Sequence, residues 1–140
     1  MKRIFFAIYL SAFFANAGTE DDRVATRADA LELAGAWSND GFKIRDGHWT
    51  GELNPAEPKL VQVNLFAGNH YWFSAAATAR ATGITISVFD EGGKPVGTEP
   101  YSDGVRAAAR FSPKVSGPYY IQLTTKEGPR SAFCLVYSYK

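Results

Sequence analysis

The stretch that decides the fold runs from Val105 to Leu123 and has the sequence VRAAARFSPKVSGPYYIQL. Its first half places an apolar residue at every second position: Val105, Ala107, Ala109 and Phe111. Arg106 and Arg110 fall on the opposite face, and after a Pro/Ser/Gly turn the alternation resumes at Tyr119, Ile121 and Leu123. Period-two alternation is typical of a strand with one face in a core and the other in water. The stretch therefore predicts two strands of a small antiparallel β-sandwich.

Further strands are predicted on both sides of this stretch, separated by turn signals. The expected segments are Lys59–Phe66, His70–Ala76, Ile84–Phe89, a short edge strand at Pro95–Thr98, and Ser131–Tyr139. Asp46-Gly47 predicts a hairpin between Phe42–Arg45 and His48–Leu53 because this dipeptide suits a tight two-residue turn. About eight short strands at even spacing indicate an all-β sandwich and not an α/β fold.

One amphipathic helix is expected before the strands, from Thr19 to Trp37. Thr19 and Asp22 have the spacing of a capping box, and the acidic first turn suits the positive end of the helix dipole. An apolar stripe at helical spacing comprises Val24, Ala28, Leu31, Ala34 or Gly35, and Trp37. We expect this stripe to pack on the sandwich, unless the helix is only a leader before it.

The N-terminus has the three parts of a secretory signal: basic Met1-Lys2-Arg3, an apolar run from Ile4 to Phe14, and Ala15-Asn16-Ala17 as the cleavage site. We predict a signal peptide at 1–17, a helix and hairpin leader at 18–58, and the sandwich at 59–140, the last two forming one compact domain. The apolar run is shorter than a membrane-spanning helix, so the exported chain, periplasmic or secreted, has no stable membrane insertion after cleavage. A buried N-terminal helix is the alternative.

Charge and cysteine content exclude one class of partner and one source of stability. The formal net charge is +1, which argues against nucleic acid as a partner. Cys134 is the single cysteine, so no internal disulfide can form and the core depends on packing. Its alternation with Ala132 and Val136 indicates a core residue in preference to a reactive thiol.

The chain resembles the bacterial pre-peptidase C-terminal (PPC) domain family between about Leu60 and Tyr139. The matching positions are Gly68, Tyr71, Phe73 and Ala75; Ile84, Ile86, Val88, Asp90, Gly93 and Val96; Phe111, Pro113, Ser116, Gly117, Tyr119, Tyr120 and Ile121; and Phe133, Leu135 and Tyr137. The resemblance implies a jelly-roll-like β-sandwich with an accessory role in secreted proteins, sometimes binding a polymer. These are packing and turn motifs, and we expect no catalytic domain here of the kind to which such modules are often appended.

No catalytic motif stands out. There is no G-x-S-x-G sequence, and a serine-type or cysteine-type centre would need His48 or His70 as its base. A small secreted hydrolase using His48 or His70 with nearby carboxylates, or with Cys134, is the enzymatic alternative. No cofactor is otherwise indicated.

Calcium is a further alternative. Asp90 and Glu91 adjoin Gly92-Gly93, and Asp103 adjoins Gly104, so loop carboxylates could hold this ion in a calcium-stabilised structural protein. Asp-Gly pairs also serve ordinary turns, which is the reading we favour.

The remaining candidates for binding are side chains expected outside the core. They are the aromatic residues Trp49, Trp72, Tyr101 and Tyr120, together with Arg106 and Arg110, which could hold a carboxylate. The aromatic residues form a binding patch unless the helix covers them. We expect an exported, non-enzymatic module that binds a protein or a polysaccharide of the cell envelope.

Overall fold

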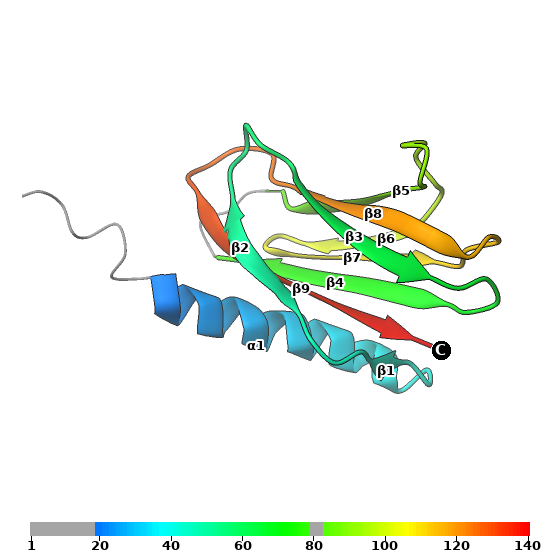
Figure 1. Cartoon of the computed structure of the whole chain (residues 1–140). Helices are drawn as coiled ribbons and strands as arrows, with labels where there is room; N and C mark the ends of the chain where they lie inside the picture. Colours follow the sequence, from blue (N-terminus) through cyan, green and yellow to red (C-terminus); the bar gives the residue numbers. More distant parts are fainter. Residues whose placement is uncertain (1–18, 79–82) are drawn as a thin grey trace, which may run out of the picture.

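The computed structural model of the chain describes residues 19–78 and 83–140. In this part, one helix is followed by nine antiparallel strands in two sheets, a β-sandwich-like arrangement (Figure 1). The expected signal peptide lies outside the described residues. Within the described ranges, no helix combines the length and the apolar character that crossing a membrane requires.

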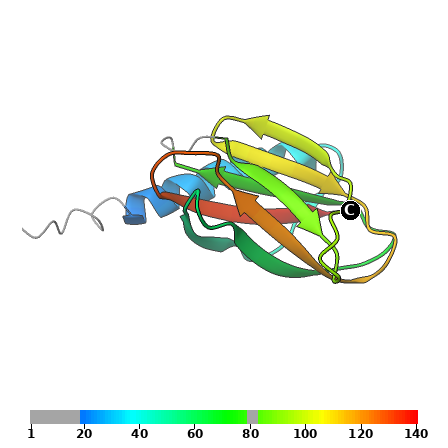
Figure 2. The ribbon, with the colours of Figure 1, turned by 90° about the horizontal axis from the view of Figure 1, so that it is seen from above.

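The larger sheet contains six strands and the smaller sheet contains three. In the larger sheet, β1 (Lys43–Ile44) and β2 (Trp49–Leu53) lie along β9 (Ser131–Tyr139), followed by β4 (Tyr71–Ala77), β7 (Arg106–Phe111) and β6 (Glu99–Asp103). The smaller sheet has the order β3 (Lys59–Leu65), β8 (Gly117–Thr124) and β5 (Thr85–Phe89). Viewed from above, the smaller sheet overlies the larger one, with the helix beyond both (Figure 2).

The main core lies between the two sheets and is built from alternate residues of their strands. Its buried members include Val61, Val63 and Leu65 on β3, Phe73 on β4, Ile86 and Val88 on β5, and Phe133, Leu135 and Tyr137 on β9. The deciding stretch contributes Ala107, Ala109 and Phe111 from β7 and Tyr119, Ile121 and Leu123 from β8. The predicted inward faces of both strands are thus confirmed.

The two strands of that stretch belong to different sheets. β7 pairs with β4 and β6, whereas β8 pairs with β3 and β5, so the intervening turn crosses from one sheet to the other. The second face of β7 is not open to water, because Ala108 is buried in a small cluster with Leu33, Phe42 and Trp72. Alternation identified the strands but could not assign them to sheets.

The hairpin predicted at Asp46-Gly47 is wrong. β1 and β2 both pair with β9, with Lys43 opposite Tyr139 and Trp49 opposite Leu135. Arg45 continues the ladder by donating its backbone N–H to the carbonyl of Tyr137 at 2.9 Å. The Asp46-Gly47 dipeptide therefore lies in a short loop that interrupts one edge strand between β1 and β2. Gly47 adopts a φ of 97° in this loop.

The edge strand predicted at Pro95–Thr98 is also misplaced. Pro95 makes only an isolated bridge to Phe89, and Val96 donates its backbone N–H to the carbonyl of Val88 at 3.0 Å. The regular strand β6 begins at Glu99 and pairs with β7. Its residues are mostly exposed and include Pro100, so this edge strand has no alternation that the sequence could show.

Helix α1 (Thr19–Ser38) forms where it was expected, but its predicted apolar stripe is mostly wrong. Val24 is 66% exposed and Leu31 is 37% exposed, whereas Thr26, Ala30, Leu33 and Ala34 are buried. Ala30 and Ala34 pack on Ala76, Cys134 and Val136 of the larger sheet. Small residues on the buried face allow the helix to approach the sheet closely. The larger apolar residues Val24 and Leu31 therefore did not indicate which face of the helix is buried.

Candidate functional site

Helix α1 covers the outer face of the larger sheet and removes Trp72 from the candidate binding residues. The Trp37 and Trp72 rings stack with centroids 3.9 Å apart and planes 6° apart. Trp37 Nε1 also donates a hydrogen bond to Ser74 Oγ at 3.1 Å. Trp72 is only 7% exposed, so the alternative that the helix covers it is confirmed.

The other three candidate aromatic residues lie in separate places. Trp49 is half-buried and stacks on Tyr137 in the main core, with ring centroids 5.8 Å apart. Tyr101 on β6 is 38% exposed and meets the edge of Trp37 at 6.0 Å. Tyr120 lies on the smaller sheet, on the opposite side of the sandwich from α1. The structure therefore does not bring the predicted aromatic residues into one patch.

The two candidate arginines are engaged with neighbours. Arg106 forms an ion pair with Asp103, and its Nε donates to Asp103 Oδ2 at 3.0 Å. Hydrogen bonding to Asp103 raises the pKa of Arg106, and burial opposes the rise. The Arg110 guanidinium lies over the Phe42 ring, 5.6 Å from its centroid. Neither arrangement leaves a paired-arginine site for a carboxylate.

An open surface remains on the outer face of the smaller sheet, which we call the β3-β8-β5 face. Its residues are Leu60, Gln62 and Asn64 on β3, Pro118, Tyr120, Gln122 and Thr124 on β8, and Thr85, Ser87 and Phe89 on β5. All of them are exposed or half-exposed. None is charged, although Asp, Glu, Lys and Arg make up 21% of the chain.

Tyr120 lies at the centre of a cross-strand row on this face. Its neighbours in register are Gln62 on β3 and Phe89 on β5. The adjoining row contains Leu60, Gln122 and Ser87, and beyond it the hydroxyl groups of Thr85 and Thr124 are hydrogen-bonded across the strands. The face thus combines aromatic rings with amide and hydroxyl groups that can donate and accept hydrogen bonds.

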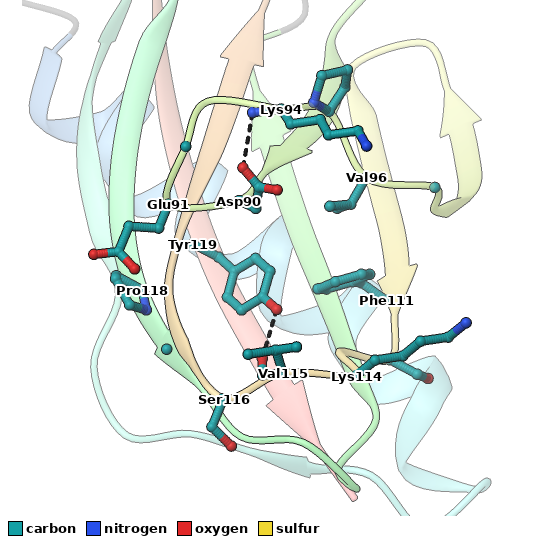
Figure 3. A pocket seen from close by; sticks show the side chains of 15 residues that line it. Asp90, Glu91, Lys94, Val96, Phe111, Lys114, Val115, Ser116, Pro118 and Tyr119 are labelled. Atoms are coloured by element: carbon teal, nitrogen blue, oxygen red, sulfur yellow. Dashed lines mark hydrogen bonds between the residues drawn. The ribbon is translucent and has the colours of Figure 1, made fainter.

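A pocket of about 620 Å³ lies at one end of the sandwich, close to this face. It is lined by the loop after β5 and by the turn between β7 and β8, and its apolar walls include Val96, Phe111, Val115, Pro118 and Tyr119 (Figure 3). Lys94 and Lys114 extend from its rim. Sequence reasoning missed this pocket because its two loops belong to strands of different sheets.

The candidate calcium ligands are not gathered into one site. Asp90 accepts the backbone N–H of Lys94 through Oδ1 at 2.9 Å, which is turn chemistry. Glu91 is exposed beside it, and Asp103 is paired with Arg106 at the far end of β7 from Phe111. Across residues 19–78 and 83–140, no three His, Cys, Asp or Glu side chains come together to hold a metal ion.

The two histidines and the cysteine also occupy different places. His48 is exposed before β2, whereas His70 lies at the start of β4 with Nδ1 2.6 Å from Ser112 Oγ. Cys134 is buried under α1, opposite Ala76 at the other end of β4. Burial raises the pKa of the Cys134 thiol to about 11. His70 therefore meets a serine and not the cysteine, a pairing that sequence spacing did not reveal.

Comparisons with known proteins give no family assignment. No protein-family model matches the sequence, and no curated protein matches it either.

Proposed function

We propose that this protein is an exported, non-enzymatic β-sandwich that binds an uncharged polysaccharide of the cell envelope through its β3-β8-β5 face. The observation that carries the proposal is the absence of charge from a broad exposed face that has Tyr120 and Phe89 side by side. Pyranose rings present apolar C–H surfaces that stack on aromatic rings. Their hydroxyl groups match the amide and hydroxyl side chains around Tyr120.

The composition of the face favours a glycan over a protein partner. Protein interfaces combine a buried apolar core with a charged or polar rim and are enriched in Arg. The β3-β8-β5 face has three amide side chains, Gln62, Asn64 and Gln122, and no guanidinium or carboxylate group. Amide side chains held on strands can form hydrogen bonds with glycan hydroxyl groups. Because these side chains are uncharged, they do not attract ions that would compete with the glycan.

The order of strands supports a jelly-roll connectivity, the arrangement that the PPC resemblance implies. The order β2-β9-β4-β7 faces β3-β8-β5, and successive strands from β2 to β5 alternate between the two sheets. The bridge at Pro95 begins a fourth position beside β5. We infer that the chain is a jelly roll with β6 added at one edge. The PPC resemblance implies that a domain with this scaffold can have an accessory, polymer-binding role.

The test is co-sedimentation of the purified protein with insoluble peptidoglycan, chitin and cellulose. We expect Tyr120→Ala to weaken binding about fivefold, since stacking on one aromatic ring contributes about 1 kcal/mol. Tyr101→Ala is the matched control, because Tyr101 is also exposed but lies on the larger sheet. Equal losses from both variants, or no binding to any polysaccharide, would contradict the proposal.

Salt provides a second readout for the same experiment. Because the face is uncharged, we expect less than about twofold change in affinity between about 50 mM and about 500 mM NaCl. A steep loss of binding at high salt would place the contact on charged side chains elsewhere.

One observation favours a second candidate function, a small secreted hydrolase. The 2.6 Å contact between His70 Nδ1 and Ser112 Oγ joins a base to an exposed nucleophile at the pocket rim. Hydrolysis of p-nitrophenyl acetate above the rate in buffer, abolished by Ser112→Ala and by His70→Ala, would support it. Equal rates for the parent protein and both variants would reject it.

A further inference from the structure

The end pocket is held open by hydrogen bonds that fix both of its loops. The Tyr119 hydroxyl donates to the carbonyl of Val115 at 2.6 Å, which holds the turn between β7 and β8 against β8 (Figure 3). The same turn is joined to the loop before β4, because Ala67 donates its backbone N–H to Ser116 Oγ at 2.8 Å. The loop after β5 is closed by the hydrogen bonds between Asp90 and Lys94. A preformed pocket binds a ligand without first ordering its walls.

The interior of the pocket is apolar. Phe111 and Tyr119 are core residues that each present part of a ring to it, at 5.2 Å between centroids and in edge-to-face orientation. Val96 is half-buried beside them, and Val115 is 70% exposed at the mouth. The volume of about 620 Å³ falls in the range of pockets that accept small organic ligands.

Two ammonium groups lie on one side of this apolar interior. The side chains of Lys94 and Lys114 extend past Val96 and Phe111, respectively, on the side of the pocket away from Glu91 (Figure 3). Both lysines are exposed, and the ion pairs found among the described residues involve neither of them.

Two carboxylates, those of Asp90 and Glu91, also line the pocket. Asp90 accepts a hydrogen bond from the backbone of Lys94 and serves its turn. Glu91 lies beside Pro118 with its carboxylate directed away from the lysines (Figure 3). The charge around the mouth is therefore divided, with the positive side next to Val96 and Phe111.

We propose that the end pocket binds a small organic anion with an apolar body, the body contacting Val96, Phe111 and Tyr119 and the anionic group lying between Lys94 and Lys114. This ligand site adjoins the β3-β8-β5 face, with which it shares Pro118, but it does not depend on polysaccharide binding. The same chemistry is offered by a free aryl or acyl carboxylate and by the C-terminus of a polypeptide that ends in an apolar residue.

The experiment is fluorescence titration of the purified protein with two dyes of similar ring structure. The first, 8-anilinonaphthalene-1-sulfonate, is an anion, and the second, N-phenyl-1-naphthylamine, is neutral. We expect Lys94→Gln and Lys114→Gln each to weaken binding of the anionic dye about threefold, and the double variant about tenfold. The neutral dye keeps its affinity in all three variants, whereas Val96→Gln weakens both dyes.

Glu91→Gln is the matched charge control. Glu91→Gln removes one negative charge, whereas each lysine variant removes one positive charge. Binding of the anionic dye to Glu91→Gln therefore stays equal or becomes tighter. The proposal is overturned if the lysine variants bind the anionic dye as the parent does, or if both dyes lose affinity equally in them. It is also overturned if Glu91→Gln weakens the anionic dye, because the carboxylate would then be part of the ligand contact.

Displacement of the bound anionic dye distinguishes the two sources of the ligand. We expect 3-phenylpropionate to displace the dye, which identifies a free acid as sufficient. Stronger displacement by the peptide Gly-Gly-Gly-Phe with a free carboxylate would assign the site to a polypeptide C-terminus. Displacement by neither compound would overturn the proposal, since both carry an anion beside an apolar ring.

Discussion

Trp72 illustrates at the residue scale how an aromatic side chain outside the main core can still be structural. By strand alternation it points away from the sandwich interior, yet it stacks on Trp37 and is almost fully buried. The exposed Tyr101 packs against Trp37 with the two ring planes nearly perpendicular. The two residues therefore differ in energetic role although the sequence presents both as outward aromatics.

We expect Trp72→Ala to lower the free energy of unfolding by about 3–5 kcal/mol, the range for truncating a buried aromatic residue. Tyr101→Ala, with more than a third of its side chain exposed, should cost less than about 1 kcal/mol. Urea denaturation followed by tryptophan fluorescence and circular dichroism measures both. Comparable losses would show that α1 does not cover Trp72 in solution.

The buried position of Cys134 predicts how its thiol reacts and how the stability of the protein depends on pH. Burial holds its pKa at about 11, so the native thiol stays protonated and does not react with dithionitrobenzoate at pH 8, but reacts in urea. Because the folded-state pKa is raised from 9.0, the associated stability is present below pH 9 and is lost as the pH rises toward 11.

Cys134→Ala is the control for that loss. Tyr137 also has a pKa raised by burial, so both proteins become less stable at high pH. The parent should lose more than Cys134→Ala between pH 9 and 11, as measured by denaturant titration at each pH. Parallel curves, or a thiol that reacts rapidly in the native state, would contradict the buried placement.

At the scale of elements, alternation located most strands correctly because each buries one side chain in two. Val61, Val63 and Leu65 on β3, and Ile86 and Val88 on β5, lie in the core as their spacing predicts. Pairing could not be predicted in the same way. The Asp46-Gly47 signal favours a hairpin locally, but β9 offers a free edge along which β1 and β2 both pair.

For helix α1, the sequence predicted the element but not the face that it buries. The helix was predicted from a capping pattern and apolar spacing, but its buried face depends on how closely it approaches the sheet. Ala30 and Ala34 are fully buried in one cluster with Ala76, Cys134 and Val136 of the larger sheet. Helical spacing alone could not choose between this face and the one containing Val24 and Leu31.

A pair of identical substitutions tests the orientation of α1. We expect Ala34→Leu to destabilise the protein by about 1–3 kcal/mol, because the added carbon atoms overpack the interface with β9 and β4. Ala28→Leu, on the exposed face, should change stability by less than about 0.5 kcal/mol. Thermal or urea unfolding compares the two. A larger loss from Ala28→Leu would mean that the helix buries the face containing Val24, Ala28 and Leu31.

At the scale of the whole molecule, the two sides of the sandwich are unequal. α1 closes the outer face of the larger sheet, while the β3-β8-β5 face stays open on the other side (Figure 1). Only Tyr120 of the predicted aromatic residues lies on this face. The sequence supplied the strand alternation that directs Gln62, Phe89 and Gln122 outward, but only the sheet order shows that they surround Tyr120.

The most direct test of the polysaccharide-binding face is a titration of the ¹⁵N-labelled protein with soluble chitin or peptidoglycan oligosaccharides, followed by two-dimensional NMR. We expect the amide signals of β3, β8 and β5 to shift in a saturable manner, with those of Gln62, Tyr120 and Phe89 among the largest shifts. Signals of α1 should remain in place. Shifts confined to α1 and β6, or no saturable shift with any oligosaccharide, would contradict it.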